Sequence, residues 1–535
     1  MGGFETWGLR STPAEVAARY RSEGWWTDES LGALLAGRLA DNASLPFVVH
    51  SRLRPWSGTF GDVLELARRV AEGLTARGIK SGDVVAFQLP NWVEAAATYY
   101  GAALVGAVVA PVVHFYGSHE VRHIVRESGA RLMVVAESFG RLRPLEALEA
   151  VRADLPSLEH VVSVGRGSPA GTTSWREFAM GSPYDAPATV DPSTPALVAY
   201  TSGTTAAPKG VVHTHSSIGA EIRQLAAMQA PDDRPALVGA PVGHGIGMLA
   251  ALLIPVWRGV AVHLIDVWEP DDVLDEILAS DVTAGSGATY FLTSLLDSGR
   301  LTPQHLRHMT HVGLGGAAIP RAVADRATRL GISIVRMYGS TEHPSITGSR
   351  HDDPVEKRLA TDGRPLPGVE IRLADDGEIL SRGPDCFAGY VDPALHVFDD
   401  DGWYCTEDVG VVDDDGYLTI TDRKKDIIIR GGENISAAEV EELLAELPGV
   451  SEVAVVSAPD ERLGEHACAF IRSTGGAPDL DVVRRHLSSS GLARQKWPEE
   501  LRVVDEFPRT PSGKIRKTDL RAQLRSEADQ ARAGR

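Results

Sequence analysis

Short apolar runs alternate with segments of helical periodicity through the first two thirds of the chain. The runs that we expect to form strands are residues 83–89, 108–112, 131–135, 160–164, 236–241, 260–265 and 282–286, with helices expected over 92–105 and 271–279. Strands that alternate with helices form largely parallel sheets that are covered on both faces. The sequence therefore predicts an α/β fold with a large N-terminal domain built from doubly wound sheets.

The pattern changes near residue 369. Short strands and Gly/Asp turns over 369–420 predict a small β-barrel-like subdomain. A helix over 436–446 with Ser436 as its N-cap, strands over 450–457 and 467–471, and a helix over 481–487 predict a small α+β domain. We expect an N-terminal core over residues 1–422, a short charged hinge over 423–426 and a C-terminal domain over 427–535.

Composition excludes several classes of function. The net charge of −19 argues against nucleic-acid binding, which needs a basic surface. The three cysteines, Cys386, Cys405 and Cys468, have no CxxC or His/Cys spacing, so we expect neither a structural metal nor disulfides, as in a reducing cytoplasm. Residues 1–12 lack a signal pattern, and Pro255 and Arg258 interrupt the most apolar stretch, so we predict no integral membrane segment.

A loop rich in hydroxyls follows the apolar run 196–199. It reads Tyr-Thr-Ser-Gly-Thr-Thr-Ala-Ala-Pro-Lys-Gly over residues 200–210. Backbone N–H groups, hydroxyls and an ammonium that converge after a strand are typical of a phosphate site, although a plain Ser/Thr-rich surface loop is the alternative. The loop is not a Walker A motif, because Pro208 stands at the second glycine position and Gly210 follows Lys209. The candidate phosphate ligands are Thr201, Ser202, Gly203, Thr204, Thr205 and Lys209.

This loop resembles the phosphate loop of the adenylate-forming (AMP-binding) superfamily, which includes acyl-CoA synthetases and aryl-acid adenylating enzymes. Four further segments occur in the order and spacing of that family. They are Tyr-Gly-Ser-Thr-Glu at 338–342, Asp-Gly-Trp-Tyr-Cys-Thr-Glu-Asp at 401–408, Asp-Arg-Lys-Lys-Asp at 422–426 with Gly-Gly-Glu-Asn at 431–434, and Pro-Arg-Thr-Pro-Ser-Gly-Lys at 508–514. The chain is identified on these motifs as a member of this superfamily, and it most resembles the acyl-CoA synthetase branch, with some resemblance to aryl-acid AMP ligases.

The resemblance implies a reaction in two halves. A carboxylate attacks the α-phosphorus of ATP and pyrophosphate leaves; a thiol, usually that of coenzyme A, then attacks the acyl-adenylate and AMP leaves. Positioning and charge neutralisation are the main demands. By resemblance, Tyr338 and Gly339 would lie on one face of the adenine, with Gly315, Gly316 and Ala317 on the other. Thr341 would bind the α-phosphate and Glu342 would bind Mg²⁺.

The remaining motifs have implied roles in the same reaction. Asp408 and Arg423 would bind the ribose, and Lys514 would bridge the substrate carboxylate and the α-phosphate. Lys425 would act as the hinge of a mobile C-terminal lid, and a second lid pose would bring Gly431, Gly432 and Glu433 to the pantetheine channel. Two positions depart from the family pattern, since Ala206 and Glu407 each stand where glycine is usual.

His244 matches a position that lines the acyl pocket and the thiol approach, although a buried structural histidine is the alternative. Aryl-acid enzymes of the 2,3-dihydroxybenzoate type commonly place asparagine next; here it is Gly245, although residues 19–27 also look like those enzymes. We expect an apolar aliphatic, alicyclic or plain aromatic acid, such as an acid of fatty-acid metabolism. Coenzyme A is the expected acceptor of the acyl group, and a carrier-protein phosphopantetheine is the alternative acceptor. A non-catalytic nucleotide-binding protein of the same fold is a further alternative function. The oligomeric state stays open, a homodimer being one possibility.

Overall fold

The computed structural model of the protein describes residues 6–533 except 168, 202–207, 230–233, 317, 318, 320, 431, 432, 461, 474, 475 and 510–513; of 433, 434, 529 and 531–533 it describes the backbone alone. The described residues divide into two compact units. The larger unit holds residues up to 370 together with 381–404, and the smaller unit holds 371–380 and 405–533.

The largest sheet of the described chain has nine strands and lies in the larger unit. Its order is β1 (Gly8–Leu9), β19 (Gly389–Tyr390), β10 (Gly210–Thr214), β9 (Pro195–Tyr200), β5 (Val108–Pro111), β4 (Val84–Gln88), β6 (Leu132–Ala136), β7 (His160–Val164) and β8 (Thr173–Ser174). Strands β9, β5, β4, β6 and β7 pair in parallel, which confirms the prediction from the alternating pattern. Strands β10, β19 and β1 extend the sheet with antiparallel pairs.

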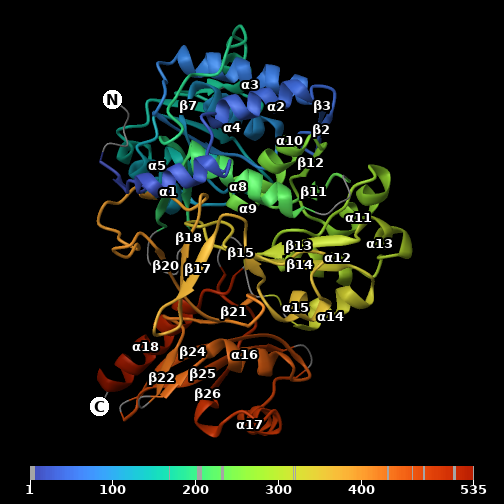
Figure 1. Ribbon diagram of the computed structural model, residues 1–535, viewed down its shortest axis with the longest axis vertical. Coiled ribbons are helices and arrows are strands. Elements are labelled where there is room, and N and C mark those ends of the chain that lie inside the picture. The colour runs from blue at the N-terminus through green and yellow to red at the C-terminus, as the bar shows by residue number, and fades with distance from the viewer. Residues whose placement is uncertain are drawn as a thin grey trace. The chain divides into compact units, whose positions relative to one another are not determined.

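Side chains of this sheet pack against helices on both faces. Along β4, Val85 and Phe87 belong to one apolar cluster, and Val84 and Ala86 belong to the other. The first cluster includes α2 (Leu31–Asp41), α3 (Phe60–Thr75) and α4 (Val93–Val105), which lie side by side in Figure 1. The second includes α5 (Ser118–Ser128) and α6 (Pro144–Glu149). This alternation buries both faces, as expected for a doubly wound sheet.

Two smaller sheets complete the larger unit. One has the order β11 (Leu237–Val238), β12 (Val262–Ile265), β2 (Pro46–His50) and β3 (Trp56–Thr59), and the other β13 (His311–Gly315), β14 (Ser333–Tyr338), β15 (Thr347–Gly348) and β16 (Arg364–Pro365). The remaining α-helices of this unit are α1 (Ala14–Ser22), α7 (Trp175–Phe178), α8 (His215–Met228), α9 (Gly245–Met248), α10 (Ile254–Arg258), α11 (Pro270–Ala279), α12 (Thr289–Asp297), α13 (Pro303–His308), α14 (Arg321–Arg329) and α15 (Val355–Ala360).

The prediction of a strand over residues 282–286 is wrong. Among the described residues, the structure has only isolated bridges here, from Thr283 within the segment to Ala236 and from Gly287 just after it to Leu314. Val282 and Ala284 are buried, which explains the apolar signal in the sequence. Gly285 and Gly287 adopt φ values of +99° and +117°, and such backbone does not continue a strand ladder.

The subdomain predicted over 369–420 is a four-stranded sheet. Its order is β17 (Glu370–Leu373), β18 (Glu378–Arg382), β20 (Tyr404–Val412) and β21 (Leu418–Arg423), and its described strands do not close into a barrel. Strand β19, which lies between β18 and β20 in the chain, belongs instead to the nine-stranded sheet.

The C-terminal part of the smaller unit has the predicted α+β composition. Its strands are β22 (Ile428–Arg430), β23 (Glu433–Ile435), β24 (Val450–Asp460), β25 (Gly464–Ser473) and β26 (Glu500–Val503), and its helices are α16 (Ala437–Ala445), α17 (Leu480–Ser489) and α18 (Lys517–Ala533). Ser436 caps α16 as predicted, because its side chain accepts a hydrogen bond from the backbone N–H of Glu439. Helices α16 and α17 share one apolar cluster with alternate residues of β24 and β25, and α18 shares the other.

Candidate active site

The ends of β13 and β14 bring two of the predicted motifs together. The strands are parallel, with Gly315 opposite Met337, so Gly315 and Gly316 lie beside Tyr338 and Gly339. A Cβ on Gly315 would lie 3.0 Å from the carbonyl oxygen of Met337, and Gly316 has a φ of +80°. Glycine at these positions lets two backbones approach closely at the carboxyl edge of the sheet, where ligands of α/β proteins commonly bind. Ala317 lies outside the described residues.

Backbone hydrogen bonds fix the turn that follows Tyr338. The backbone N–H of Phe387 donates to the carbonyl of Glu342 over 2.8 Å. Nε2 of His213 lies 2.8 Å from the carbonyl oxygen of Thr341. Burial lowers the pKa of His213 to about 4, so the ring is neutral at physiological pH and its Nε2–H donates to that carbonyl. Thr341 and Glu342 are thus held from two sides by segments distant in sequence.

One carboxylate oxygen of Glu342 is hydrogen-bonded to Tyr390. The hydroxyl of Tyr390 donates to Oε1 over 2.8 Å, and the residue is only 8% exposed. Among the described residues, the hydrogen bond of this carboxylate goes to Oε1, and Oε2 receives none. The described residues also contain no cluster of three or more His, Cys, Asp or Glu side chains that could hold a metal by themselves. A single carboxylate oxygen fits a hard divalent cation that takes its other ligands from phosphate and water.

A buried acidic pair lies behind this turn. His343, the neighbour of Glu342, contacts Asp385 (Nε2 to Oδ1, 3.2 Å), and both side chains are fully buried. Glu221 hydrogen-bonds to Asp385 and accepts from Ser345. Desolvation, followed by the charge of Asp385, raises the pKa of Glu221 well above its usual range. Burial alone would also raise the pKa of Asp385, but His343 and the bond from Glu221 outweigh it and lower that pKa. Of the two carboxyl groups, Glu221 is therefore the one that binds a proton more readily.

The two ends of the predicted phosphate loop lie together. The backbone N–H of Thr201 donates to the carbonyl of Lys209, and the N–H of Lys209 donates to Oγ1 of Thr201. The ammonium of Lys209 lies over the ring of Tyr390, 5.4 Å from its centroid. Ser202, Gly203, Thr204, Thr205 and Ala206 lie outside the described residues, so their predicted roles stay predictions.

His244 caps the short helix α9. Its Nδ1 accepts from the backbone N–H of Ile246, and the residue is half-buried. The side chain of Ile246 extends to the β13 edge, where its Cδ1 would lie 3.0 Å from a Cβ on Gly316. Phe291 and Gly287 border the same apolar region. A Cβ on Gly245 would meet no atom within 4 Å, so open space adjoins this position.

The smaller unit holds a second group of candidates. Asp408 and Arg423 are register partners in β20 and β21, and Nε of Arg423 lies 2.7 Å from Oδ1 of Asp408. Lys514 is an exposed residue by surface area, yet desolvation of its ammonium and the cation of Arg423 lower its pKa to about 8, against the opposing charge of Asp408. These three side chains therefore share one electrostatic environment.

Lys425 lies in the turn after β21, and its ammonium pairs with the carboxylate of Glu407 at 2.5 Å. Gly431 and Gly432 lie outside the described residues, and only the backbone of Glu433, in β23, is described.

Two residues of the site were missed by the motif analysis. Tyr390 is 48 positions from Glu342, and His213 is 128 positions from Thr341. Neither lies in one of the five segments, and a lone tyrosine after glycine or a lone histidine in a strand has no local signature. Their proximity to the site depends on strands β10 and β19 pairing in one sheet.

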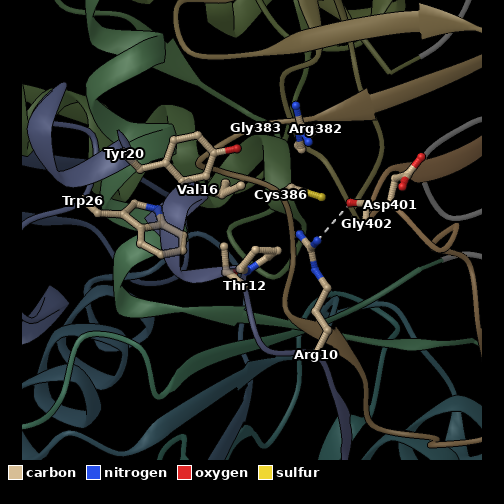
Figure 2. A pocket seen from close by; sticks show the side chains of 11 residues that line it. Arg10, Thr12, Val16, Tyr20, Trp26, Arg382, Gly383, Cys386, Asp401 and Gly402 are labelled. Atoms are coloured by element: carbon tan, nitrogen blue, oxygen red, sulfur yellow. Dashed lines mark hydrogen bonds between the residues drawn. The ribbon is translucent and has the colours of Figure 1, made fainter. Parts of the chain in front are cut away.

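The N-terminal segment borders a separate pocket in the larger unit. Figure 2 shows Tyr20 and Trp26 on one side of it and Arg382 and Cys386 on the other. Arg10 donates to the carbonyl of Gly402 over 3.2 Å, the dashed line in Figure 2. No predicted site residue is among the described residues that line it. The segment that resembles aryl-acid enzymes thus contributes to packing: Nε1 of Trp26 donates to the carbonyl of Pro384.

No helix among the described residues is both long and apolar enough to cross a bilayer. Cys386, Cys405 and Cys468 are free thiols in this structure, and Cys386 and Cys468 are buried.

Comparison with known proteins agrees with this geometry. Residues 46–391 match the family model for the AMP-binding enzyme, and residues 439–514 match that for the AMP-binding enzyme C-terminal domain. The chain is 34% identical to medium-chain fatty-acid–CoA ligase of Escherichia coli, over 95% of this chain and 92% of that protein. It is 33% identical to salicylyl-CoA synthase / salicylate adenylyltransferase of a Streptomyces species, over 99% of each. The ATP-bound structure of MatB from Rhodopseudomonas palustris superposes with a TM-score of 0.81 at 28% identity, covering 91% of this chain and 98% of that one.

Proposed function

Because this chain belongs to the AMP-binding enzyme family, we propose that it is an AMP-forming acid–thiol ligase. It activates a carboxylic acid with ATP, releases pyrophosphate, and transfers the acyl group from the acyl-adenylate to coenzyme A. The observation that carries the proposal is the pairing of β13 with β14, which sets Gly315 and Gly316 beside Tyr338. The two glycines allow the backbone at that edge to approach a flat base closely. Glu342, whose carboxylate has one oxygen hydrogen-bonded to Tyr390, follows shortly after Tyr338 in the sequence.

In this proposal the adenine lies between the Gly315–Gly316 backbone and Tyr338. Thr341 binds the α-phosphate, and Lys209 with the preceding loop binds the leaving phosphates. Glu342 would hold Mg²⁺, which when bound supplies charge neutralisation to the phosphates. The neutral His213 and the N–H of Phe387 support these roles, because they fix the backbone from which Thr341 and Glu342 project.

The smaller unit supplies the ribose contacts and the cation for adenylation. Asp408 and Arg423 bind the ribose hydroxyls, and Lys514 offsets the charge that builds up on the carboxylate and α-phosphate. The electrostatic coupling of Lys514 to Asp408 and Arg423 supports a shared site. The domain division at 422 and 427, the hinge at Lys425 and the pantetheine contacts of Gly431, Gly432 and Glu433 are part of this proposal and stay predictions.

The acid is apolar and of small to medium size. Ile246 and Phe291 border the region next to His244, and the named relatives act on a medium-chain fatty acid and on salicylate. Loading of a carrier-protein phosphopantetheine is the second candidate function, since the name of the second relative includes adenylyl transfer to salicylate, a step that does not specify the later acceptor. The cytoplasmic location and the oligomeric state stay predictions.

A pyrophosphate-release screen tests the proposal. The protein is incubated with ATP and a panel of aliphatic, alicyclic and aromatic acids, with coenzyme A, with a holo carrier protein, or with neither. We expect acid-dependent pyrophosphate release, with AMP and a CoA thioester in the first arm. Thioester only on the carrier favours the second candidate. Nucleotide binding without pyrophosphate release for any acid identifies a non-catalytic relative and refutes the proposal.

A further inference from the structure

Tyr390 contacts two charged candidates at once. Its hydroxyl donates to Oε1 of Glu342 over 2.8 Å, and the ammonium of Lys209 lies 5.4 Å from its ring centroid. Glu342 is the proposed ligand of the cation, and Lys209 is the proposed contact to the leaving phosphates. One buried side chain therefore touches both groups that would neutralise the phosphates of ATP.

The backbone of Tyr390 is fixed between two strands. It pairs with Val211 of β10 on one side and with Gly8 of β1 on the other. The preceding Gly389 has a φ of +146°, and a Cβ there would lie 2.0 Å from the carbonyl oxygen of Gly8. Tyr390 is thus held between two neighbouring strands of the nine-stranded sheet. A side chain locked in this way can hold a partner in one orientation.

The ring of Tyr390 is packed as tightly as its backbone. It is 2% exposed and makes an edge-to-face contact with Phe387 at 5.0 Å between centroids. Phe387 also donates its backbone N–H to the carbonyl of Glu342. The main chain and the side chain of Glu342 are therefore both positioned by residues of the same short segment.

The chemistry of the contact defines its consequence. A carboxylate has two oxygens, and the hydrogen bond from the Tyr390 hydroxyl to Oε1 restricts the orientation of the group. Oε2, to which no side chain of the described residues donates, then remains available to a cation. The ring face below Lys209 attracts the ammonium through its quadrupole and restricts it, since a cation within about 6 Å of an aromatic face is stabilised.

We propose that Tyr390 is a positioning residue for the metal–nucleotide complex: its hydroxyl orients Glu342 toward the cation, and its ring holds Lys209 toward the phosphates. The inference rests on the proposed function but concerns binding, so it can be measured without turnover. Residues outside a metal's ligand set that orient a ligand typically change metal affinity about 10- to 100-fold when they are removed.

The test uses the full chain with Tyr390→Phe, which removes the hydroxyl and keeps the ring. The affinity for Mn²⁺ is measured by electron paramagnetic resonance with saturating adenosine 5′-(α,β-methylene)triphosphate. Calorimetry in EDTA measures the affinity of the same nucleotide without metal. Tyr100→Phe is the matched control, because it removes another buried hydroxyl that makes a 2.8 Å hydrogen bond, to the carbonyl of Leu252.

We expect Tyr390→Phe to raise the Kd for Mn²⁺ about 10-fold, in line with the effect of outer-shell substitutions. Metal-free nucleotide binding should stay within about 2-fold of wild type because the ring below Lys209 remains. Tyr100→Phe should change neither value. In a Glu342→Gln background, Tyr390→Phe should have no further effect on Mn²⁺ affinity, because the carboxylate that the hydroxyl orients is already absent.

Two results would overturn the inference. One is a Kd for Mn²⁺ in Tyr390→Phe that is indistinguishable from wild type. The other is an equal loss in the Glu342→Gln background, which would indicate a general effect on packing. If wild type releases pyrophosphate with an acid while either result holds, this inference fails alone. A wild type that binds neither nucleotide nor Mn²⁺ would overturn the proposed function as well.

Discussion

Glu407 and Lys425 form an ion pair across the start of the predicted hinge. The carboxylate of Glu407 lies 2.5 Å from the ammonium of Lys425, and both side chains are partly exposed. Glu407 has a φ of +60°, in the left-handed region that favours glycine, and glycine is usual at this position in the family that the chain resembles. Its backbone N–H donates to Oε1 of Glu378, so this strained position within β20 is also held from β18. The backbone conformation that glycine would allow without strain is therefore kept here with a charged residue.

The strain at Glu407 can be separated from its ion pair by two substitutions. Glu407→Gly and Glu407→Ala both remove the pair with Lys425, which as an exposed pair contributes at most about 1 kcal/mol. Only glycine relieves the positive φ, so we expect Glu407→Gly to be more stable than Glu407→Ala by about 1 kcal/mol. Urea denaturation followed by circular dichroism measures the difference. Equal stability of the two variants would show that the backbone at residue 407 stores no strain.

Lys514→Ala should separate the two half-reactions. We expect acid-dependent ATP–pyrophosphate exchange to fall by about three orders of magnitude, because a preorganised cation at the reacting phosphate is lost. Thioester formation from a supplied acyl-adenylate should survive. Lys496→Ala, which removes a lysine paired with Glu439 in the same unit, is the control and should leave both halves intact. Equal loss of both half-reactions in Lys514→Ala would contradict the assigned role.

The adenylation half should also lose activity as the pH rises through about 8. Desolvation and the Arg423 cation lower the pKa of Lys514 to about 8, so the ammonium loses its charge at a pH well below that of an ordinary lysine. Arg423→Met removes the like charge and should move the alkaline limb of the exchange rate to higher pH, even where it lowers the rate itself. Arg472→Met, which removes an arginine paired with Glu452, should leave the limb in place. A limb at the same pH in all three proteins would exclude Lys514 as its source.

Glu221→Gln should stabilise the protein increasingly as the pH rises. The pKa of Glu221 is raised in the folded state, so wild type must keep this group protonated at a cost that grows above the unfolded value near 4.5. Glutamine is neutral at every pH and can still accept from Ser345 and donate to Asp385. Thermal unfolding from pH 5 to 9 should show a growing advantage of the variant, by at most about 1.4 kcal/mol per pH unit.

Glu94→Gln is the matched control for that experiment. Glu94 is buried, but its carboxylate accepts a hydrogen bond from Nε of Arg54 at 3.0 Å. Replacing this charged partner with glutamine should therefore destabilise the protein. A constant difference between wild type and Glu221→Gln across the pH range would show that Glu221 is not held protonated.

Gly245→Asn should shift acid preference toward ortho-hydroxy aryl acids. The position adjoins open space, so the amide can be accommodated and can hydrogen-bond a substrate hydroxyl. Gly245→Ala controls for the loss of space alone. The measurement is kcat/KM in pyrophosphate release for salicylate against benzoate, for which we expect an increase of about 10-fold in the ratio. An unchanged ratio would show that Gly245 does not face the acid.

The sequence by itself determined the features in which neighbours along the chain decide the outcome. Ser436 caps its helix because the acceptor and the N–H of Glu439 are three residues apart. Strands such as His160–Val164 form where an apolar run has the right length, and the five motifs identify the family because each is a contiguous set of chemical groups. The tertiary structure decided what depends on distant partners. Tyr390 meets Glu342, and Glu407 meets Lys425, because strand pairing joins segments whose separation in sequence contains no information about distance. Val282 and Ala284 show that an apolar pattern in the sequence indicates burial but does not by itself predict a strand. The positive φ of Gly285 and Gly287 prevents a strand from forming there.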